Sequence, residues 1–326
     1  MAVKLENLIV GLILAAASLF VVVLNSTVIF VLLRCGLYKR NGIYVLAFAN
    51  MIGKLRLKDL LQERFTGDTV QQILTLTYVA PSLIFQDFLV GKDEHAPAVL
   101  FFAYVFLFMW YEGMWIQGAI AIDRLLNVVF IGVARQASIR TYFWISAGIY
   151  VLSALMAVWS QLLSPCCTAY IFYGAFGYSY LGSTYNYADH FIDLPLNSTV
   201  TILMFVCYAW IYFFVRRSNR QISVTGDEMT KRKAKEIKFA TQFSIIASVL
   251  AFTWISFRVF PMVIRPEIGI PQLYSLVTLA LTFHCSTNAT IFLSMNAEFR
   301  RSYQKTFGFS KLPSSQTATE VSKTHY

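Results

Sequence analysis

An unbroken apolar stretch near the start of the chain is the feature that most constrains the fold. The segment "LIVGLILAAASLFVVVLNSTVIFVLL" runs from Leu8 to Leu33 without a charged residue. A helix needs about 20 apolar residues to cross the hydrocarbon core of a bilayer, whereas the apolar core of a signal peptide has about 7 to 15. We therefore expect a membrane-spanning helix that stays in the mature protein.

The composition of the whole chain agrees with a membrane protein. Of 326 residues, 57% are hydrophobic and 13% are charged, and the mean hydropathy is +0.58, which lies outside the usual balance of a soluble domain. The net charge of +10 does not indicate nucleic-acid binding, because no basic run is interleaved with stacking aromatic residues. Excess Lys and Arg in a membrane protein instead marks cytoplasmic loops.

Catalytic and metal-binding side chains are scattered rather than clustered. A membrane-embedded enzyme needs a metal or nucleophile cluster, and the four histidines are far apart in sequence: His95, His190, His284 and His325. The five cysteines show no metal-ligand spacing, and we expect free thiols at Cys166 and Cys167 because a bond between adjacent cysteines is strained. We expect no enzyme activity, no metal and no cofactor.

Further apolar stretches predict several crossings. Six stretches are long enough to span a bilayer: residues 8–33, 98–122, 142–163, 194–215, 239–264 and 268–295. The loop 216–238 holds eight basic and three acidic residues, whereas 164–195 has no Lys or Arg. The basic loops share the cytoplasmic side only if residues 42–90 cross once. The sequence therefore predicts an all-α membrane protein, a bundle of seven transmembrane helices with its N-terminus outside and its C-terminus inside.

The second crossing is interrupted. Its apolar halves, residues 43–53 and 73–89, flank a charged insert at about 54–70 that contains Lys54, Arg56, Lys58, Asp59, Glu63, Arg64 and Asp68. Seven charges at mid-bilayer would cost roughly 17 to 25 kcal/mol, so we expect the insert outside the hydrocarbon core. Either residues 34–72 form an enlarged cytoplasmic loop, or Lys54 to Val70 is intron-like sequence from a faulty gene model, which is the alternative we favour.

Two helix ends carry motifs that resemble rhodopsin-like G-protein-coupled receptors. "IAIDRLLNVVF" closes the third span with an acidic-Arg pair, and "NATIFLSMNAEFR" resembles the Asn-Pro-x-x-Tyr region, followed by a short amphipathic helix at about Asn296 to Phe309. The segments "AFAN", "YVAP", "SPCCTAYIFYGAFGYSY" and "FATQ" narrow the resemblance to nematode serpentine chemoreceptors, most like class X. On this resemblance residues 1–309 form the receptor domain, and 310–326 form a disordered cytoplasmic tail.

The resemblance implies a function and a set of partners. The chain would be an orphan chemosensory receptor in the plasma membrane of sensory neurons, with their cilia as an expected site. It would bind a small external molecule and activate a heterotrimeric G protein. The alternatives are a membrane transporter or channel, for which no internal repeat or charged helix row gives support, and an inactive receptor product of mis-splicing.

The resemblance also implies residues for the activation switch. These are Asp123, Arg124, Asn288 and Asn296. The alternative for Arg124 is a topological role, because a guanidinium at the membrane boundary can reach water. Ala289 and Phe292 replace the proline and tyrosine of the general motif, and Trp254 lies seven residues before Pro261 instead of beside it.

Polar residues inside the spans are candidates for internal contacts. Asn25 matches the buried asparagine of the family, and Asn50 and Glu112 are further buried candidates. Glu112 lies about 16 Å along the helix from Asp123, and it either contacts a ligand or is a protonated carboxyl bonded to a neighbouring helix.

Aromatic residues of the third span predict a ligand pocket in the outer half of the bundle. The candidates are Tyr104, Phe108, Tyr111 and Glu112, since aromatic walls with few polar groups suit small, partly apolar molecules. The alternative is that these rings pack helices or face lipid. The sequon at Asn197 leaves open whether that residue is glycosylated.

Overall fold

A computed structural model describes residues 4–35, 67–129, 139–164, 167–180, 186–221, 241, 244–245, 247–257 and 271–308. Asn50, the apolar half-span 43–53, most of the charged insert, most of the loop 216–238 and the tail 310–326 lie outside these residues.

The described chain is mostly helical. Its helices are α1 (Leu5–Arg34), α3 (Gly67–Leu74), α4 (Ala80–Phe85), α5 (Pro97–Val129), α7 (Ile139–Val158), α8 (Leu194–Gln221), α10 (Ser275–Met295) and α11 (Ala297–Phe307), with a further helical segment at Ala247–Phe257. Its π-helical segments are η2 (Thr75–Val79), η3 (Trp159–Leu163) and η5 (Asp189–Asp193), and its 3-10 turns are η4 (Tyr173–Ala175) and η7 (Pro271–Tyr274). Strands β1 (Ala169–Phe172) and β2 (Gly177–Tyr180) form an antiparallel hairpin.

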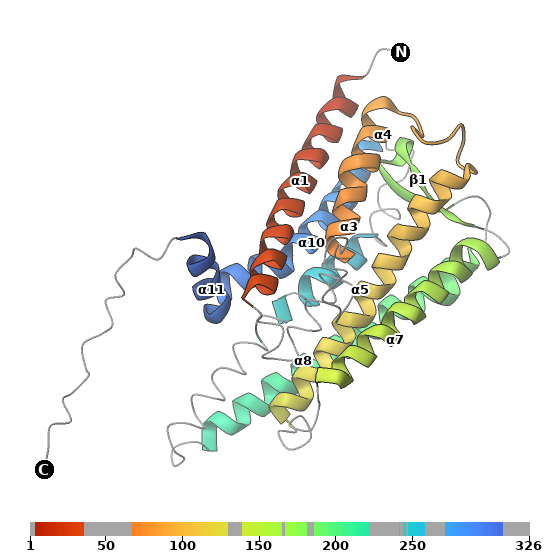
Figure 1. Cartoon of the computed structure of the whole chain (residues 1–326). Coiled ribbons are helices and arrows are strands. Elements are labelled where there is room, and N and C mark those ends of the chain that lie inside the picture. The colour runs from red at the N-terminus through yellow and green to blue at the C-terminus, as the bar shows by residue number, and fades with distance from the viewer. Residues whose placement is uncertain are drawn as a thin grey trace, which may run out of the picture.

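The helices form a bundle around α5. Helix α5 packs against α3, α7, α8 and the hairpin, while α1 packs against α3, α4 and α10. Figure 1 shows that the start of α1, the end of α4 and the hairpin lie at one end of the bundle, here called the hairpin end. Helix α11 lies beside the opposite end of α1. Five helices among the described residues are long and apolar enough to span a membrane, and the segment Ala247–Phe257 is shorter.

Large apolar side chains cover the outside of these helices. Exposed examples on α1, α7 and α8 are Leu12, Phe20, Val23, Trp144, Val151, Leu155, Ile202, Phe205 and Phe213. A soluble protein rarely exposes so continuous an apolar surface, because water would have to cover it. The bundle therefore has the surface of a protein whose solvent is lipid.

The helix of the second crossing begins earlier in the chain than the positions of the charged residues predict. Helix α3 starts at Gly67 and continues through η2 and α4 to Phe85, about 28 Å of helix. Asp68, which we assigned to the charged insert outside the hydrocarbon core, is only 5% exposed inside the bundle. The helix thus includes residues 67–70, which the sequence assigned to the charged insert. A buried carboxylate is tolerated where it has a hydrogen-bond partner, and Asn288 of α10 donates to Asp68.

Two of the π-helical segments precede prolines inside continuous helices. Proline lacks an N–H and its ring clashes with the carbonyl four residues earlier. For Pro81 that carbonyl belongs to Thr77 of η2, and for Pro195 it belongs to Phe191 of η5. The wider π turn relieves the clash without breaking the helix.

Helix α1 approaches α4 closely at a glycine. A Cβ added at Gly11 would lie 2.3 Å from Cγ1 of Ile84 and 3.1 Å from the carbonyl oxygen of Ala80. Both distances are shorter than van der Waals contact, so a residue without a side chain is required here.

Helix α11 is the short helix expected after the seventh span. Asn296 caps its start, because the Oδ1 atom accepts a hydrogen bond from the backbone N–H of Phe299 at 3.1 Å. Phe299 is fully buried and packs against Phe292 of α10. Arg300 is exposed on the other side of the helix. The helix is thus amphipathic and is anchored across the ends of α1 and α10.

Candidate functional site

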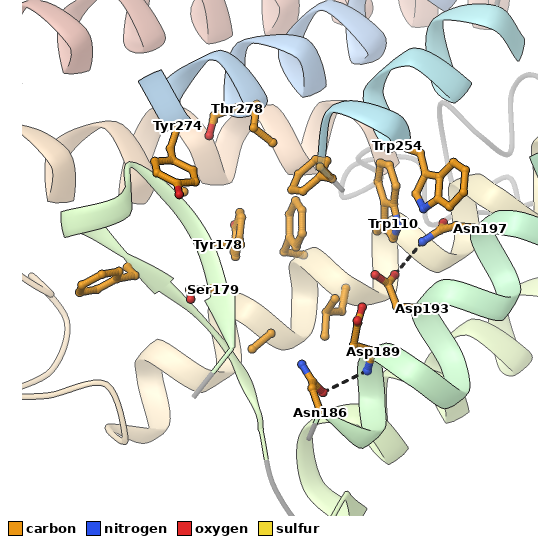
Figure 2. Close-up of a pocket in the computed structure, with 17 residues that line it drawn as sticks. Trp110, Tyr178, Ser179, Asn186, Asp189, Asp193, Asn197, Trp254, Tyr274 and Thr278 are labelled. Atoms are coloured by element: carbon orange, nitrogen blue, oxygen red, sulfur yellow. Dashed lines mark hydrogen bonds between the residues drawn. The ribbon is translucent and has the colours of Figure 1, made fainter. Parts of the chain in front are cut away.

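A cavity of about 550 Å³ lies at the hairpin end of the bundle. Its walls come from α5, the hairpin, η5 and α8, the segment Ala247–Phe257, and η7 and α10 (Figure 2). Seven of the 17 described lining residues are aromatic: Phe106, Trp110, Phe172, Tyr178, Trp254, Phe257 and Tyr274. A cavity of this size and chemistry fits a small organic molecule.

The hairpin is fixed in place as one wall of this cavity. The Gln161 side chain binds both the N–H and the carbonyl of Ala169, at 2.8 and 3.0 Å, in the way a neighbouring strand would. Thr278 of α10 donates to the carbonyl of Phe176, at 3.0 Å, at the hairpin's turn. The Phe106 and Tyr178 rings stack with centroids 3.7 Å apart, joining α5 to β2.

The polar part of the cavity comes from one side of η5 and α8. Asp189, Asp193 and Asn197 are spaced four residues apart and all line the cavity. A π-helical turn holds more residues than an α-helical turn. Residues four positions apart in η5 therefore lie on the same side of the helix, and Asp189 and Asp193 both face the cavity. The Asn197 Nδ2 donates to Asp193 Oδ1 at 2.8 Å, and Asn186 Oδ1 accepts from the backbone N–H of Asp189 at 3.0 Å.

Three buried polar atoms of the lining make no hydrogen bond within the described part of the chain. They are Nε1 of Trp254, Oδ1 of Asn197 and the hydroxyl of Tyr178. Burial raises the pKa of the Tyr178 hydroxyl, so this group stays protonated and can donate. A buried polar group without a partner costs free energy, which a bound molecule or water would recover.

The opposite end of α5 carries a buried ion pair. Nη2 of Arg124 lies 2.5 Å from Oδ2 of Asp123, and Nε lies 3.1 Å from the same atom. The Tyr142 hydroxyl of α7 donates to the other carboxylate oxygen at 2.5 Å. Asn127 donates to the backbone carbonyl of Asp123 at 2.8 Å. The Asp123 and Arg124 side chains are at most 9% exposed, so this arrangement keeps a charged pair away from solvent.

A buried polar network lies between α1, α3 and α10. Nδ2 of Asn288 donates to Oδ2 of Asp68 at 2.9 Å. Nδ2 of Asn25 donates to the carbonyl of Cys285 at 3.2 Å, and the Cys285 thiol donates to Oε1 of Gln71 at 3.4 Å. These bonds tie the first, second and seventh helices together.

The comparison with protein families decides what this arrangement is. Residues 61–296 match the family of serpentine type 7TM GPCR chemoreceptors named Srx, which is more than half of the chain. This chain belongs to the Srx chemoreceptors. The family consists of G-protein-coupled receptors of nematodes, not enzymes, and the expected resemblance is therefore confirmed.

The fold of this Srx receptor is also that of a solved rhodopsin. Squid rhodopsin matches with a TM-score of 0.66 at 14% identity, over 95% of this chain and 88% of the rhodopsin chain. At this identity the match shows the fold alone, and it agrees with the expected seven-helix bundle. No curated protein matches the Srx chain.

Most of the polar residues expected to matter lie inside the Srx bundle. Asp123 and Arg124 form the ion pair at the end opposite the hairpin, and Asn288 and Asn25 belong to the buried network. Asn296 lies at the junction of α10 and α11 and caps α11. Asn50 lies outside the described residues.

The four residues expected to line the pocket lie elsewhere. Tyr104 stacks on Phe108, and Phe108 packs against Tyr150 of α7. Tyr111 is fully buried with its hydroxyl 3.2 Å from Oγ of Ser160, and Glu112 has Tyr150 as its polar neighbour. None of the four lines the cavity. Successive residues turn by about 100° around a helix, so the lining uses Phe106, Leu107 and Trp110 while the expected residues face α7.

Several residues of the cavity and of the buried polar contacts were missed by the sequence reasoning. Asp68 follows several other charged residues in the sequence, so nothing marked it as part of the bundle. Tyr142 was not recognised because its partner, Asp123, lies on another helix. The spacing of Asp189, Asp193 and Asn197 was a usable signal in a segment without Lys or Arg.

The structure also bears on the cysteines and the sequon. Cys167 is disulfide-bonded, which corrects the expected free thiol, while Cys166 lies outside the described residues. Asn197 is 1% exposed and donates to Asp193 inside a helix. Glycosylation requires an accessible asparagine, so this sequon is not a glycosylation site in the folded receptor.

Proposed function

We propose that this Srx receptor binds a small external molecule in the cavity at the hairpin end and activates a heterotrimeric G protein at the other end. The observation that carries the proposal is that one helix, α5, contributes to both sites. Trp110 lines the cavity and Arg124 forms the ion pair, 14 residues apart or about 21 Å along the helix.

Signal transfer would proceed by a shift between two packings of the helices. A ligand shifts such an equilibrium only if it binds one packing better than the other. The described walls of the cavity come from α5, the hairpin, η5, α8, the segment Ala247–Phe257, η7 and α10, so a bound molecule would contact several helices at once. Movement of α8 relative to α5 would in turn change the surroundings of Arg124, since Tyr208 of α8 lies within electrostatic reach of this guanidinium.

The orientation in the membrane follows from charge. The hairpin end would face outside, because the segment 164–195 has no Lys or Arg, and the basic loop 216–238 would lie in the cytoplasm. The receptor is a multi-pass membrane protein, and we place it in the plasma membrane of chemosensory neurons, including their cilia.

The test is the substitution Arg124→Ala. It removes the guanidinium that a G protein would meet and leaves the cavity intact. Basal and agonist-evoked G-protein activation should fall to the background of untransfected cells, while surface labelling stays at the level of the unmodified receptor. Arg34→Ala is the matched control, because Arg34 is an exposed arginine at the end of α1. Coupling that persists in Arg124→Ala would contradict the assigned role.

A further inference from the structure

Two polar atoms of opposite kind lie in the walls of the cavity without a hydrogen-bond partner. They belong to Trp254 and Asn197, which both line it. The Nε1–H of Trp254 can only donate a hydrogen bond, and Oδ1 of Asn197 can only accept one. Both atoms are buried, and neither makes a hydrogen bond within the described part of the chain. A ligand group that meets both atoms therefore has to accept and to donate.

The hydrogen bond to Asp193 decides which atom of the Asn197 amide stays without a partner. Nδ2 of Asn197 donates to Oδ1 of Asp193 at 2.8 Å. A carboxylate only accepts hydrogen bonds, so the amide nitrogen has to lie on this side and the amide oxygen on the other. Asn197 is 1% exposed, so bulk water does not reach this oxygen.

Trp254 is placed by the anchoring of the segment Ala247–Phe257. Oγ1 of Thr253 donates to the carbonyl oxygen of Ala280 in α10 at 3.3 Å, which ties the residue before Trp254 to the neighbouring helix. Figure 2 shows the indole with its nitrogen turned toward Asn197. The donor and the acceptor thus lie on the same side of the cavity.

The rest of the lining suits an apolar body. Trp110 of α5 and Phe257 pack with ring centroids 5.8 Å apart, and Leu107 and Val277 add aliphatic surface. Such walls bury the hydrocarbon part of a ligand. The Tyr178 hydroxyl also makes no hydrogen bond within the described chain, but it can donate or accept and so does not narrow the ligand class.

From these observations we propose that the cavity recognises a small uncharged molecule with a hydroxyl group on an apolar body, the hydroxyl accepting from Nε1 of Trp254 and donating to Oδ1 of Asn197. A hydroxyl is the smallest organic group that does both. The two side chains are uncharged, so the ligand needs no charge to bind them. This inference rests on the proposed function, since it names the ligand class of the same cavity.

Buried polar atoms of this kind make a site selective. A ligand without the hydroxyl leaves a buried donor and a buried acceptor without partners, and a site built to hydrogen-bond a hydroxyl rejects an analogue that lacks it. A methyl ether leaves only the acceptor without a partner, because its oxygen can accept but cannot donate. Alcohols, ethers and hydrocarbons of similar shape therefore report on the two atoms separately.

Equilibrium binding to the purified full-length receptor in nanodiscs tests the proposal, with empty nanodiscs as the background. The probes are three alcohols with different apolar bodies: 2-phenylethanol, 1-octanol and 2-(1-naphthyl)ethanol. Each is measured beside its methyl ether and beside the hydrocarbon in which a methyl group replaces the hydroxyl. At least one alcohol should bind about tenfold or more tightly than its hydrocarbon, with the ether between them.

Two substitutions separate the roles of the two atoms. Trp254→Phe removes the donor, so the alcohol and the ether should both lose about twofold to tenfold in affinity relative to the hydrocarbon. Asn197→Leu removes the acceptor, so the alcohol should lose its advantage over the ether, while the ether keeps its advantage over the hydrocarbon. The lost bond to Asp193 affects all three probes and cancels in these ratios. Trp144→Phe, the same change at a 70% exposed residue of α7, should leave every ratio unchanged.

Three results would overturn the proposal. They are equal or tighter binding of the hydrocarbons, no binding of any alcohol, and an alcohol preference that survives in both Trp254→Phe and Asn197→Leu. If one variant does not fold, the other decides. The assay contains no G protein, so its result is independent of coupling. Activation only by compounds without a hydroxyl would leave the receptor function standing and refute the hydroxyl, whereas alcohol binding without activation would do the reverse.

Discussion

Tyr142 is the side chain that links the ion pair of α5 to a second helix. Its hydroxyl donates to Asp123 at 2.5 Å, and Asp123 in turn holds the buried Arg124. A hydrogen bond to a charged group is worth about 1.5 to 3 kcal/mol where water is excluded, and less here because Tyr142 is only half-buried. Arg124 is thus held inward by its neighbour in sequence and, through that neighbour, by α7.

Removal of this hydroxyl should favour the packing in which Arg124 is released. In Tyr142→Phe we expect basal G-protein activation to rise several-fold, because Asp123 loses one of the two groups that hold it. The measurement is agonist-free G-protein activation at matched surface expression. Tyr212→Phe is the control, since Tyr212 is exposed on the outer face of α8. Basal activation that stays equal or falls would show that Tyr142 does not restrain the pair.

At the level of single residues, the sequence predicted those polar residues that belong to short motifs. Asp123 and Arg124 are adjacent, so their pairing was visible in the sequence. Asp68 was not recognised as a bundle residue, because its partner, Asn288, lies 220 positions away. The predicted pocket residues do not line the cavity, since α5 has aromatic side chains on more than one face, and only its packing against α7 decides which face remains for the cavity.

Helices were predictable wherever apolar length alone defines them. The predicted spans 8–33, 142–163 and 268–295 correspond to α1, to α7 with η3, and to η7 with α10. The start of the second crossing could not be predicted from the sequence. A charged residue such as Asp68 predicts the end of a membrane-spanning helix unless its partner in the bundle, here Asn288, is known. The family match begins at residue 61, ahead of Gly67, which supports the view that the residues just before α3 belong to the receptor.

Two deletions test where the second helix begins. Removal of residues 54–66 keeps Gly67 to Val70, whereas removal of 54–70 deletes Asp68 and brings Met51 into its place. The longer deletion leaves the buried amide of Asn288 without its carboxylate, at a cost of about 1 to 3 kcal/mol. We expect the 54–66 deletion to be the more thermally stable and the more abundant at the cell surface. Equal or higher stability of the 54–70 deletion would support the alternative that the whole segment is intron-like sequence.

The whole molecule combines a ligand-sized cavity and a buried ion pair at opposite ends of one bundle. Loop charge predicted the odd number of crossings, and the family and fold comparisons agree with a seven-helix receptor. A buried polar network of Asn25, Asp68 and Asn288 joins three helices of this bundle to one another. The arrangement therefore suits transmission of a conformational change.

The most direct test of the central claim is G-protein activation in cells that express the full chain, measured across a panel of small odorants and alcohols beside a surface-labelling control. The account predicts that at least one compound evokes a G-protein response that is absent from untransfected cells. A chain that reaches the surface, gives no G-protein response and carries one of the compounds across the membrane would contradict it and indicate a transporter.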